Sequence, residues 1–264
     1  MANSHGRFVW YELMTTDLAA ARTFYGNVVG WQAIDGQMPG MDYWMFTEGE
    51  MPVTGLMNLP DEARNMGTPP SWIGYIAVDD VDASTSMVTA NGGKVYRPAT
   101  DIPNVGRFSI VADPQGAAFA LFKSANPEQD QPQDMTAKGR VGWHELYAVD
   151  QASVFDFYAR LFGWKKAEAM DMGEMGVYQT FGAADEADVG LRGNMLGGMM
   201  NKPPMLPVAV WGYYFNVGNI DEAAERVKAA GGQVTMGPQD VPGGGFVLSG
   251  IDPQGAGFAL FGSR

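Results

Sequence analysis

The stretch that decides the fold is WYELMTTDLAAARTFYGNVVGW at residues 10–31, because it returns as WHELYAVDQASVFDFYARLFGW at residues 143–164, an offset of 133 residues (143 − 10). A second stretch, DPQGAAFALF at 113–122, returns as DPQGAGFALF at 252–261, an offset of 139 residues (252 − 113). A repeat of this length is too long for a solenoid unit, which runs to about 50 residues. The pattern therefore predicts a duplicated domain.

The segment between the two copies has the composition of a linker. It reads SANPEQDQPQDMTAKG (124–139), which is rich in Pro, Gln and Asp and poor in apolar residues. We therefore predict a first domain at 1–123, a linker at 124–139 and a second domain at 140–264. Because the offset grows from 133 to 139, the second copy carries a net excess of six residues (139 − 133). We expect most of them in a longer hairpin loop at 183–194.

Each copy contains the same pattern of elements twice. In the first copy, Phe8–Met14 is predicted as a strand, Asp17 is placed to cap a helix, and Gly30 ends that helix where a left-handed backbone is needed. Three short strands follow, and the pattern then restarts near Ile73. The predicted helices lie near 18–29, 81–90, 152–162 and 220–230. The expected fold is α+β, with tandem duplicated domains that each contain two βαβββ modules.

Composition limits the classes of function. The chain has 264 residues, 46% of them hydrophobic, which is enough apolar content for a core. Its net charge of −13 disfavours nucleic acid and anionic membranes as partners. It has no cysteine, only His5 and His144 as histidines, no apolar stretch of about 18 residues and no signal-peptide pattern. We therefore expect a cytoplasmic protein without disulfides, thiolate nucleophiles or Cys-based zinc sites.

The repeated stretches resemble the vicinal oxygen chelate superfamily, which includes glyoxalase I, extradiol dioxygenases, and fosfomycin- and bleomycin-resistance proteins. The resemblance rests on the strand–Asp–helix–FY–GW pattern, on VDDVDAS…NGGKV (78–95) and on GRFSIVADPQGAAFALF (106–122), and it covers nearly the whole chain. The W-x-E-L start and the DPQGA-x-FALF end are similar to a two-domain bacterial subgroup. The resemblance implies that paired modules form a half-open barrel around a concave cavity that holds the ligand.

Metal-dependent members of that superfamily hold the ion with His, Gln or Glu on the concave face. The resemblance places the corresponding positions of this chain at Trp10, Trp143, Ile73, Gly212, Ala120 and Ala259, with a fourth-strand ligand within 54–58 or 197–201. None of these positions is His, Gln, Asp or Glu, and His144 is the one exception when the positions are moved by one residue. A first-row divalent metal needs about three N, O or S donors. We therefore expect no metal site and no cofactor.

Two carboxylates are the candidate catalytic residues. Glu12 and Glu145 each follow a tryptophan by two positions, so in a strand each shares the face of Trp10 or Trp143. A buried carboxylate is costly unless it is paired, and burial raises its pKa, as in a general base or an acceptor that orients a ligand. The alternative is a structural carboxylate that is bonded to Arg or Tyr, or that reaches solvent. His144 is expected on the opposite face of its strand.

The candidate binding residues form an aromatic set with one amide. They are Trp10, Trp143, Trp44, Tyr75, Tyr147, Tyr214, Asn216, Phe122 and Phe261. The alternative is that these rings fill the barrel as core. The Met-rich run at 194–206 is interpreted either as an adaptable apolar wall or as ordinary packing. The DPQG segments are predicted to be tight turns without a chemical role.

Three hypotheses of function stay open from the sequence. The first is a metal-independent protein that binds, or also transforms, a small apolar or aromatic molecule in the concave barrel. The second is a metal-dependent glyoxalase-like (lactoylglutathione lyase) or dioxygenase-like enzyme with displaced ligands drawn from Glu12, Glu145 and His144. The third is a non-catalytic interaction protein with filled barrels. Whether the chain is an enzyme stays open; the expected partner is a small-molecule ligand, and the expected assembly is a monomer or homodimer.

Overall fold

The computed structural model describes residues 4–38, 40–127, 134–183 and 195–264. The extra loop expected in the second copy at 183–194 falls almost entirely outside these residues. Within the described part of the chain, no helix has both the length and the apolar character needed to cross a membrane.

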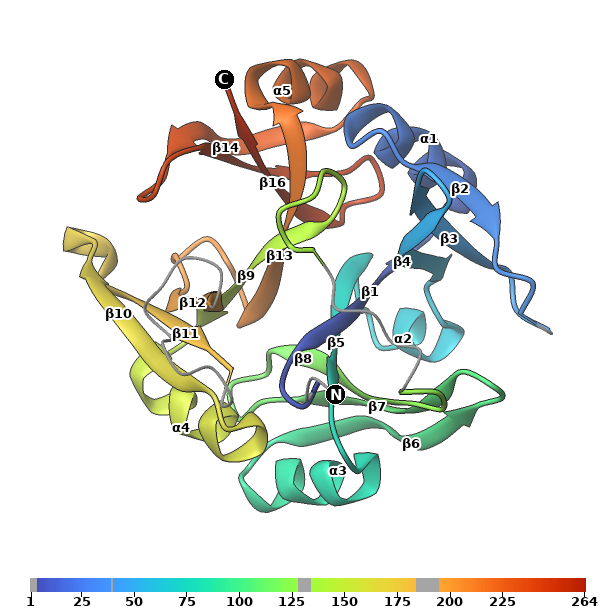
Figure 1. The fold of residues 1–264 in the computed structure, drawn as a ribbon, viewed down its shortest axis with the longest axis vertical. Helices are drawn as coiled ribbons and strands as arrows, with labels where there is room; N and C mark the ends of the chain where they lie inside the picture. The colour runs from blue at the N-terminus through green and yellow to red at the C-terminus, as the bar shows by residue number, and fades with distance from the viewer. Residues whose placement is uncertain (1–3, 39, 128–133, 184–194) are drawn as a thin grey trace. The chain divides into compact units, whose positions relative to one another are not determined.

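In the first repeat, each module begins with a strand and a helix and continues with three strands (Figure 1). The first module contains β1 (Phe8–Thr15), α1 (Leu18–Val28), β2 (Gln32–Asp35), β3 (Tyr43–Glu48) and β4 (Met51–Asn58). A short helix α2 (Asp61–Asn65), absent from the predicted pattern, leads to the second module. That module contains β5 (Ser71–Ala77), α3 (Val81–Ala90), β6 (Lys94–Ile102), β7 (Gly106–Ala112) and β8 (Ala118–Ser124).

The second repeat has the same sequence of elements. Its first module contains β9 (Val141–Ala148), α4 (Gln151–Phe162), β10 (Lys165–Asp171), a 3-10 turn η1 (Gly173–Met175), β11 (Val177–Gly182) and β12 (Met195–Asn201). Its second module contains β13 (Val210–Asn219), α5 (Ile220–Ala229), β14 (Gln233–Asp240), β15 (Phe246–Ile251) and β16 (Gly257–Ser263).

The two repeats form two eight-stranded sheets with the same strand order. The order is β2-β3-β4-β1-β5-β8-β7-β6 in the first and β10-β11-β12-β9-β13-β16-β15-β14 in the second. Each order has two free ends, so neither sheet closes into a full barrel. The predicted α+β fold, with two tandem repeats of paired βαβββ modules, is confirmed.

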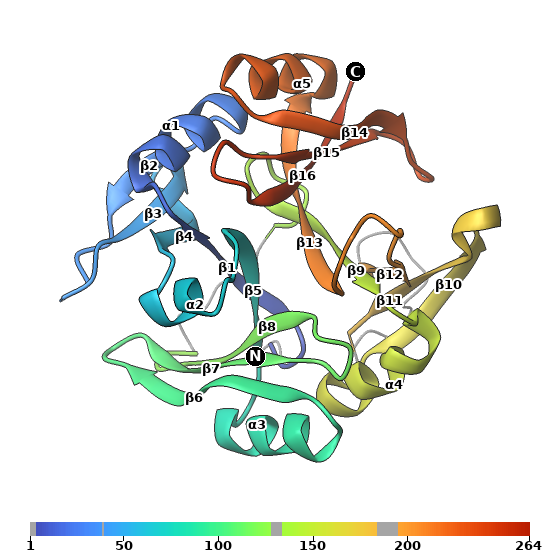
Figure 2. The ribbon, with the colours of Figure 1, turned by 180° about the vertical axis from the view of Figure 1, so that it is seen from behind.

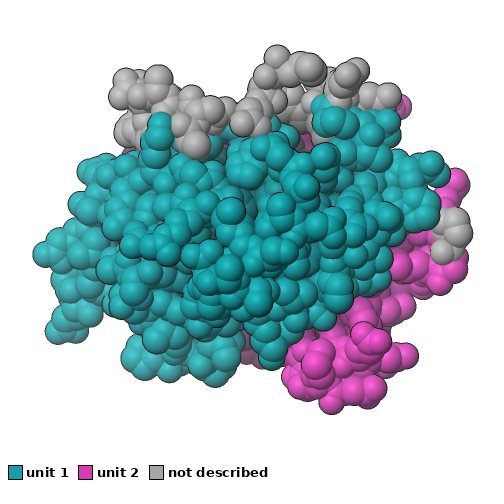
Figure 3. Space-filling model, turned by 90° about the horizontal axis from the view of Figure 1, so that it is seen from below, with its two compact units in different colours: residues 1–9, 74–132, 143–211 teal, residues 10–73, 133–142, 212–264 magenta. Residues whose placement is uncertain are grey.

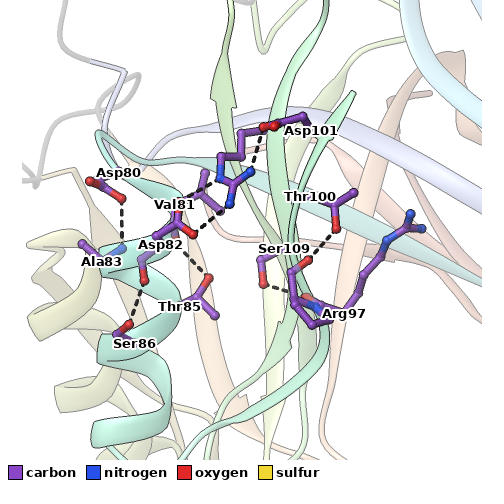
Figure 4. Close-up of polar contacts among 12 residues, drawn as sticks. Asp80, Val81, Asp82, Ala83, Thr85, Ser86, Arg97, Thr100, Asp101 and Ser109 are labelled. Atoms are coloured by element: carbon purple, nitrogen blue, oxygen red, sulfur yellow. Dashed lines mark hydrogen bonds and ion pairs between the residues drawn. The ribbon is translucent and has the colours of Figure 1, made fainter. Parts of the chain in front are cut away.

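The helices begin and end where the local sequence predicts. The Asp17 carboxylate accepts a hydrogen bond from the Ala20 N–H at 3.0 Å, at the start of α1. Asp80 caps α3 in the same way through the Ala83 N–H at 2.9 Å (Figure 4). Helix α4 ends at Gly163 with φ 70°, and Gly30 follows α1 with φ 97°. Both glycines therefore adopt positive φ values, which residues with a Cβ atom rarely accept.

The described chain divides into two compact units that cut across the repeats (Figure 3). Unit 1 contains residues 1–9, 74–132 and 143–211, whereas unit 2 contains residues 10–73, 133–142 and 212–264. Unit 1 thus combines most of the second module of repeat 1 with the first module of repeat 2. Unit 2 combines most of the first module of repeat 1 with the second module of repeat 2.

Helices cover one face of the strands in each unit. In unit 1, α3 packs on β6, β7 and β8 and also contacts α4 (Figure 2). In unit 2, α1 packs on β2 and β4 and contacts α5, which covers β14, β15 and β16. The first-module strands therefore have a helix-covered face and a second face, called here the helix-free face.

In unit 1, α4 is tied to the DPQG turn of the first repeat. The hydroxyl of Tyr158 donates to the Asp113 carboxylate at 2.9 Å and accepts from the Trp211 indole N–H at 3.0 Å. The predicted tight turn is present, because the Gly116 N–H donates to the Asp113 carbonyl at 3.0 Å. Burial raises the pKa of the Asp113 carboxyl.

Unit 2 contains the same arrangement with the repeats exchanged. The hydroxyl of Tyr25 donates to the Asp252 carboxylate at 3.1 Å and accepts from the Trp72 indole N–H at 2.9 Å. The turn closes through the Gly255 N–H and the Asp252 carbonyl at 3.0 Å. In each unit, the FY motif of one repeat therefore contacts the DPQG motif of the other.

Candidate functional site

A hydrogen-bonded chain of Trp, Tyr and Glu occupies the helix-free face of the first module of repeat 1. Strand alternation puts Trp10 and Glu12 on one face of β1. The Trp10 indole N–H donates to the hydroxyl of Tyr43 at 3.1 Å, and the Tyr43 hydroxyl is in turn hydrogen-bonded to the Glu12 carboxylate. Glu12 is buried, with 7% of its surface exposed to solvent.

The tyrosine in this chain is held neutral. Burial, followed by the negative charge of Glu12, raises the pKa of the Tyr43 hydroxyl far above its usual value. A neutral phenol donates its O–H to the carboxylate while its oxygen accepts the indole N–H. Hydrogen bonds are therefore donated from the Trp10 indole to the Tyr43 phenol, and from the phenol to the Glu12 carboxylate.

A glycine on β4 makes room for the tyrosine. Gly55 lies opposite Glu12 in the parallel pairing of β1 and β4. A Cβ atom on Gly55 would collide with the Tyr43 hydroxyl and would lie 3.1 Å from Oε1 of Glu12. Gly55 also falls within 54–58, where the family resemblance places a fourth-strand metal ligand. The tyrosine thus lies over part of the strand segment in which the resemblance expects that ligand.

Repeat 2 builds the same chain on β9, β11 and β12, within unit 1. The Trp143 indole N–H donates to the Tyr178 hydroxyl at 2.7 Å, and Tyr178 is hydrogen-bonded to Glu145. Burial, with the charge of Glu145 as the next cause, raises the pKa of Tyr178 well above its usual value. Gly198 pairs with Glu145, and a Cβ atom there would collide with the Tyr178 ring.

The donor set of the two chains does not fit a divalent metal. An indole N–H donates and cannot ligate, and a phenol with a strongly raised pKa resists deprotonation. Each chain offers one carboxylate, which already accepts the O–H of its tyrosine. Among the described residues, no three His, Cys, Asp or Glu side chains gather closely enough to hold an ion.

The histidine considered as a displaced ligand lies elsewhere. His144 is buried on the opposite face of β9 from Glu145, where its ring stacks on Phe8 at 3.9 Å between centroids. Its Nδ1 is hydrogen-bonded to the carbonyl of Leu196. Burial lowers the pKa of His144 to about 4, so the ring is neutral at pH 7. Glu12 belongs to the other unit. Within unit 1, β9 therefore does not bring Glu145 and His144 to the same face.

Trp44 lies on the helix-covered face of β3. The guanidinium of Arg22, from α1, sits 3.7 Å from the centroid of its ring, and the Trp44 indole N–H donates to Asp42 at 2.8 Å. Because side chains alternate along a strand, the neighbouring Tyr43 points to the helix-free face. The aromatic residue in the candidate site is thus Tyr43, one position from the predicted one.

Asn216 holds the backbone of the segment that precedes β9. Its side-chain N–H groups donate to the carbonyls of Met135 and Ala137 at 2.8 and 3.0 Å. A Cβ atom on Gly142 would collide with this amide, so the contact is close. Through these contacts, Asn216 links β13 to the segment that connects the two repeats, which is a structural role.

The remaining predicted residues lie in an aromatic group of unit 1, on β13 and β16 of unit 2, and on β9. In unit 1, Tyr75 lies 6.2 Å from both Phe108 and Phe122 between ring centroids, and Arg97 stands 4.9 Å above Phe108. In unit 2, Tyr214 is buried and Phe261 is half-buried. Tyr147 is close enough to Tyr178 to influence its pKa.

The helix-covered side of unit 2 carries an open groove between α1 and α5. It has a volume of about 540 Å³ and is lined by Ala19, Ala20, Thr23, Phe24, Asn27, Ala229, Ala230 and Pro253. None of the predicted site residues lines it, and its walls are mostly small side chains. The groove therefore lies apart from the Trp–Tyr–Glu chain of the same unit.

The sequence matches a known family in both repeats. Residues 7–121 and 140–260 each match the profile of the Glyoxalase/Bleomycin resistance protein/Dioxygenase superfamily. The chain is similar to CFP32 of Mycobacterium bovis, which is named as a candidate glyoxylase, with 37% identity over 254 residues, covering 95% of this chain and 92% of that protein. It is also similar to the anthracycline biosynthesis protein DnrV of Streptomyces peucetius, with 30% identity over 269 residues, covering 97% of this chain and 92% of that one.

Two solved enzyme structures have a similar fold. The Mn(II)-bound glyoxalase from Novosphingobium aromaticivorans has a TM-score of 0.63 at 17% identity, covering 99% of this chain and 83% of its own. The 2,3-dioxygenase LapB from Pseudomonas sp. KL28 has a TM-score of 0.64 at 14% identity, covering 99% of this chain and 94% of its own. At these identities the likeness concerns the fold alone.

Proposed function

Because this chain belongs to the Glyoxalase/Bleomycin resistance protein/Dioxygenase superfamily, we propose that it binds a small apolar or aromatic molecule on its helix-free sheet faces without a divalent metal. The observation that carries the proposal is the Trp–Tyr–Glu chain, which in both repeats begins at the tryptophan (Trp10 or Trp143) that the family resemblance aligns with the first metal ligand. In each repeat, the tyrosine over the glycine and the tryptophan on the first strand present aromatic surface on this face, where a metal site would present a set of N or O ligands.

The chemistry of the two faces favours a planar ligand. Trp10 and Trp143 are half-buried, so part of each indole is available for stacking. Each chain holds a carboxylate next to the ring, which favours ligands that carry a hydroxyl or amine donor. The name of DnrV supports the same class, because anthracyclines are polycyclic aromatic molecules with hydroxyl and carbonyl groups.

If the ligand is also transformed, Glu12 and Glu145 are the groups that would accept a proton from it. The tyrosine O–H fixes one side of each carboxylate, which positions the group for a bound ligand. This step requires only a ligand with an acidic O–H or C–H bond and a carboxylate within hydrogen-bond distance of it. Binding without turnover is the minimal form of the proposal.

A metal-dependent glyoxalase-like activity is the second candidate. It is favoured by the 37% identity to CFP32, which is named as a candidate glyoxylase. The residues of the Trp–Tyr–Glu chains do not offer the donors that such an ion requires. This candidate therefore needs a donor set outside the two chains.

The experiment is a calorimetric titration of 2-naphthol into protein that has been dialysed against EDTA. We expect saturable binding that added Mn²⁺, Ni²⁺ or Zn²⁺ leaves unchanged, and weaker binding in Glu12→Gln and Glu145→Gln variants. Tyr96→Phe, on the exposed part of β6, serves as the control. Binding only in the presence of a metal would support the second candidate, and no binding under either condition would contradict the proposal.

A further inference from the structure

The helix-free faces of the two repeats differ at two matched positions. On the first strand, Met14 of repeat 1 pairs with Met57, whereas Tyr147 of repeat 2 pairs with Met200. The register is equivalent because Glu12 pairs with Gly55 and Glu145 pairs with Gly198 in the same strands. At this matched position of the first strand, repeat 1 thus has the thioether of Met14 and repeat 2 has the phenol of Tyr147.

The second difference lies across the glycine. Met45 pairs with Gly55 in repeat 1, and Thr180 pairs with Gly198 in repeat 2. The Thr180 hydroxyl donates a hydrogen bond to the backbone carbonyl of Glu168 at 3.0 Å and accepts one from the backbone N–H of Glu168 at 2.9 Å. Thr180 is therefore engaged with β10, and its smaller side chain replaces the long side chain of methionine on that face.

These replacements give the faces different chemistry. In repeat 1, three half-buried methionines (Met14, Met45 and Met57) share the sheet face of the Trp–Tyr–Glu chain and give it polarizable apolar surface. In repeat 2, the half-buried Tyr147 adds a second phenol close to Tyr178. A phenol oxygen can donate one hydrogen bond and accept others, so it can bind a ligand group in addition to its protein contacts.

We propose that the two faces are inequivalent sites, and that Tyr147 selects ligands with a hydroxyl or carbonyl group at the face of repeat 2. The face of repeat 1 has Met14 at the matched position and lacks this second phenol, so it distinguishes less between such ligands and ligands that are purely apolar or aromatic. The inference rests on the proposed function, because it assigns a specificity to faces that must first bind a ligand.

The test compares two probes that share a ring system and differ by one hydroxyl, naphthalene and 2-naphthol. Their dissociation constants are measured with wild-type protein, Tyr147→Phe and the control Tyr96→Phe, which makes the same chemical change at an exposed tyrosine. We expect Tyr147→Phe to weaken 2-naphthol binding about 3- to 10-fold, the range for a lost hydrogen bond. Naphthalene binding should change by less than about 2-fold, and Tyr96→Phe should affect neither probe.

A second variant tests the same residue by gain of function. Met14→Tyr gives the face of repeat 1 the phenol of repeat 2, so it should raise the preference of that face for 2-naphthol over naphthalene. Circular dichroism checks that both variants are folded. If both probes bind but Tyr147→Phe leaves their ratio unchanged, or weakens both equally, the inference is wrong and the proposed function stands. If neither probe binds the wild-type protein, the proposed function itself fails.

Discussion

The hydroxyl of Tyr158 donates a 2.9 Å hydrogen bond to Asp113, a residue of the other repeat. Tyr25 and Asp252 make the matching contact at 3.1 Å in unit 2. In each unit, the recurring FY stretch of one repeat therefore contacts the recurring DPQG stretch of the other repeat. The tyrosine and aspartate of these stretches hold modules of different repeats together, which is a structural role separate from that of the tryptophan and glutamate at their start.

Replacing Tyr158 by phenylalanine should destabilise the protein. The change leaves a buried Asp113 carboxylate oxygen and the Trp211 indole N–H without their shared hydroxyl. We expect a loss of about 1–3 kcal/mol in the free energy of unfolding, the cost of unsatisfied buried polar groups. Urea denaturation measures it, with Tyr96→Phe as the exposed control, for which less than about 0.5 kcal/mol is expected. Equal free energies of unfolding for the two variants would show that the Tyr158 hydroxyl does not stabilise the fold.

Replacing Gly55 by alanine should disturb the Trp–Tyr–Glu chain of repeat 1. The new methyl group would occupy the space of the Tyr43 hydroxyl, so the ring must move and the contact with Glu12 must lengthen. Overpacking of this kind costs about 1–3 kcal/mol. Adding Tyr43→Phe to Gly55→Ala should recover part of the loss, because the hydroxyl that collides is removed. Thermal or urea unfolding of the single and double variants checks this, and strictly additive losses would contradict it.

Acid should destabilise the protein through His144. The unfolded chain takes up a proton near pH 6.5, whereas burial lowers the pKa of the folded ring to about 4. The unfolded state therefore binds more protons between these values, and the stability contributed by neutral His144 is lost as the pH falls from about 6.5 to about 4. Between pH 7 and 5 we expect a loss of about 2 kcal/mol from this group.

The His144→Asn variant isolates that contribution. An asparagine amide can still donate to the Leu196 carbonyl, but it does not titrate. Its free energy of unfolding should be lower than that of the wild type at pH 7 and should change less between pH 7 and 5. The wild-type carboxyls Asp113 and Asp252, whose pKa values burial raises, titrate in both proteins and cancel in the comparison. Identical pH profiles for the two proteins would refute the buried, neutral histidine.

Local signals in the sequence predicted the regular elements well. Helix α3 occupies Val81–Ala90 as predicted, because Asp80 and the glycines after Asn91 mark both its ends. Strand β6 (Lys94–Ile102) is longer than its local sequence indicates. Pro98 favours ending a strand, but β6 continues to Ile102 through a shift in its pairing with β7. Such a bulge depends on the neighbouring strand, which local sequence does not specify.

The candidate site was predicted only in part, for the same reason. Strand parity relates Glu12 to Trp10 within one strand, and the structure places both in one hydrogen-bonded chain. The link between them, Tyr43, comes from another strand, so its place depends on pairing and was missed in favour of Trp44. One signal was available: GLMN at 55–58 recurs as GMMN at 198–201, which marks the two glycines under the tyrosines.

We infer that the Trp–Tyr–Glu chains stand in place of a metal site and that the protein binds its ligand without a metal. The most direct measurement is the melting temperature of the purified protein in EDTA and with added Mn²⁺ or Zn²⁺. A metal bound to the folded state would raise the melting temperature by mass action. Because no metal is expected to bind the folded state, the melting temperature should be the same under all three conditions. A fall of several degrees on chelation, reversed by adding one of these metals, would contradict it.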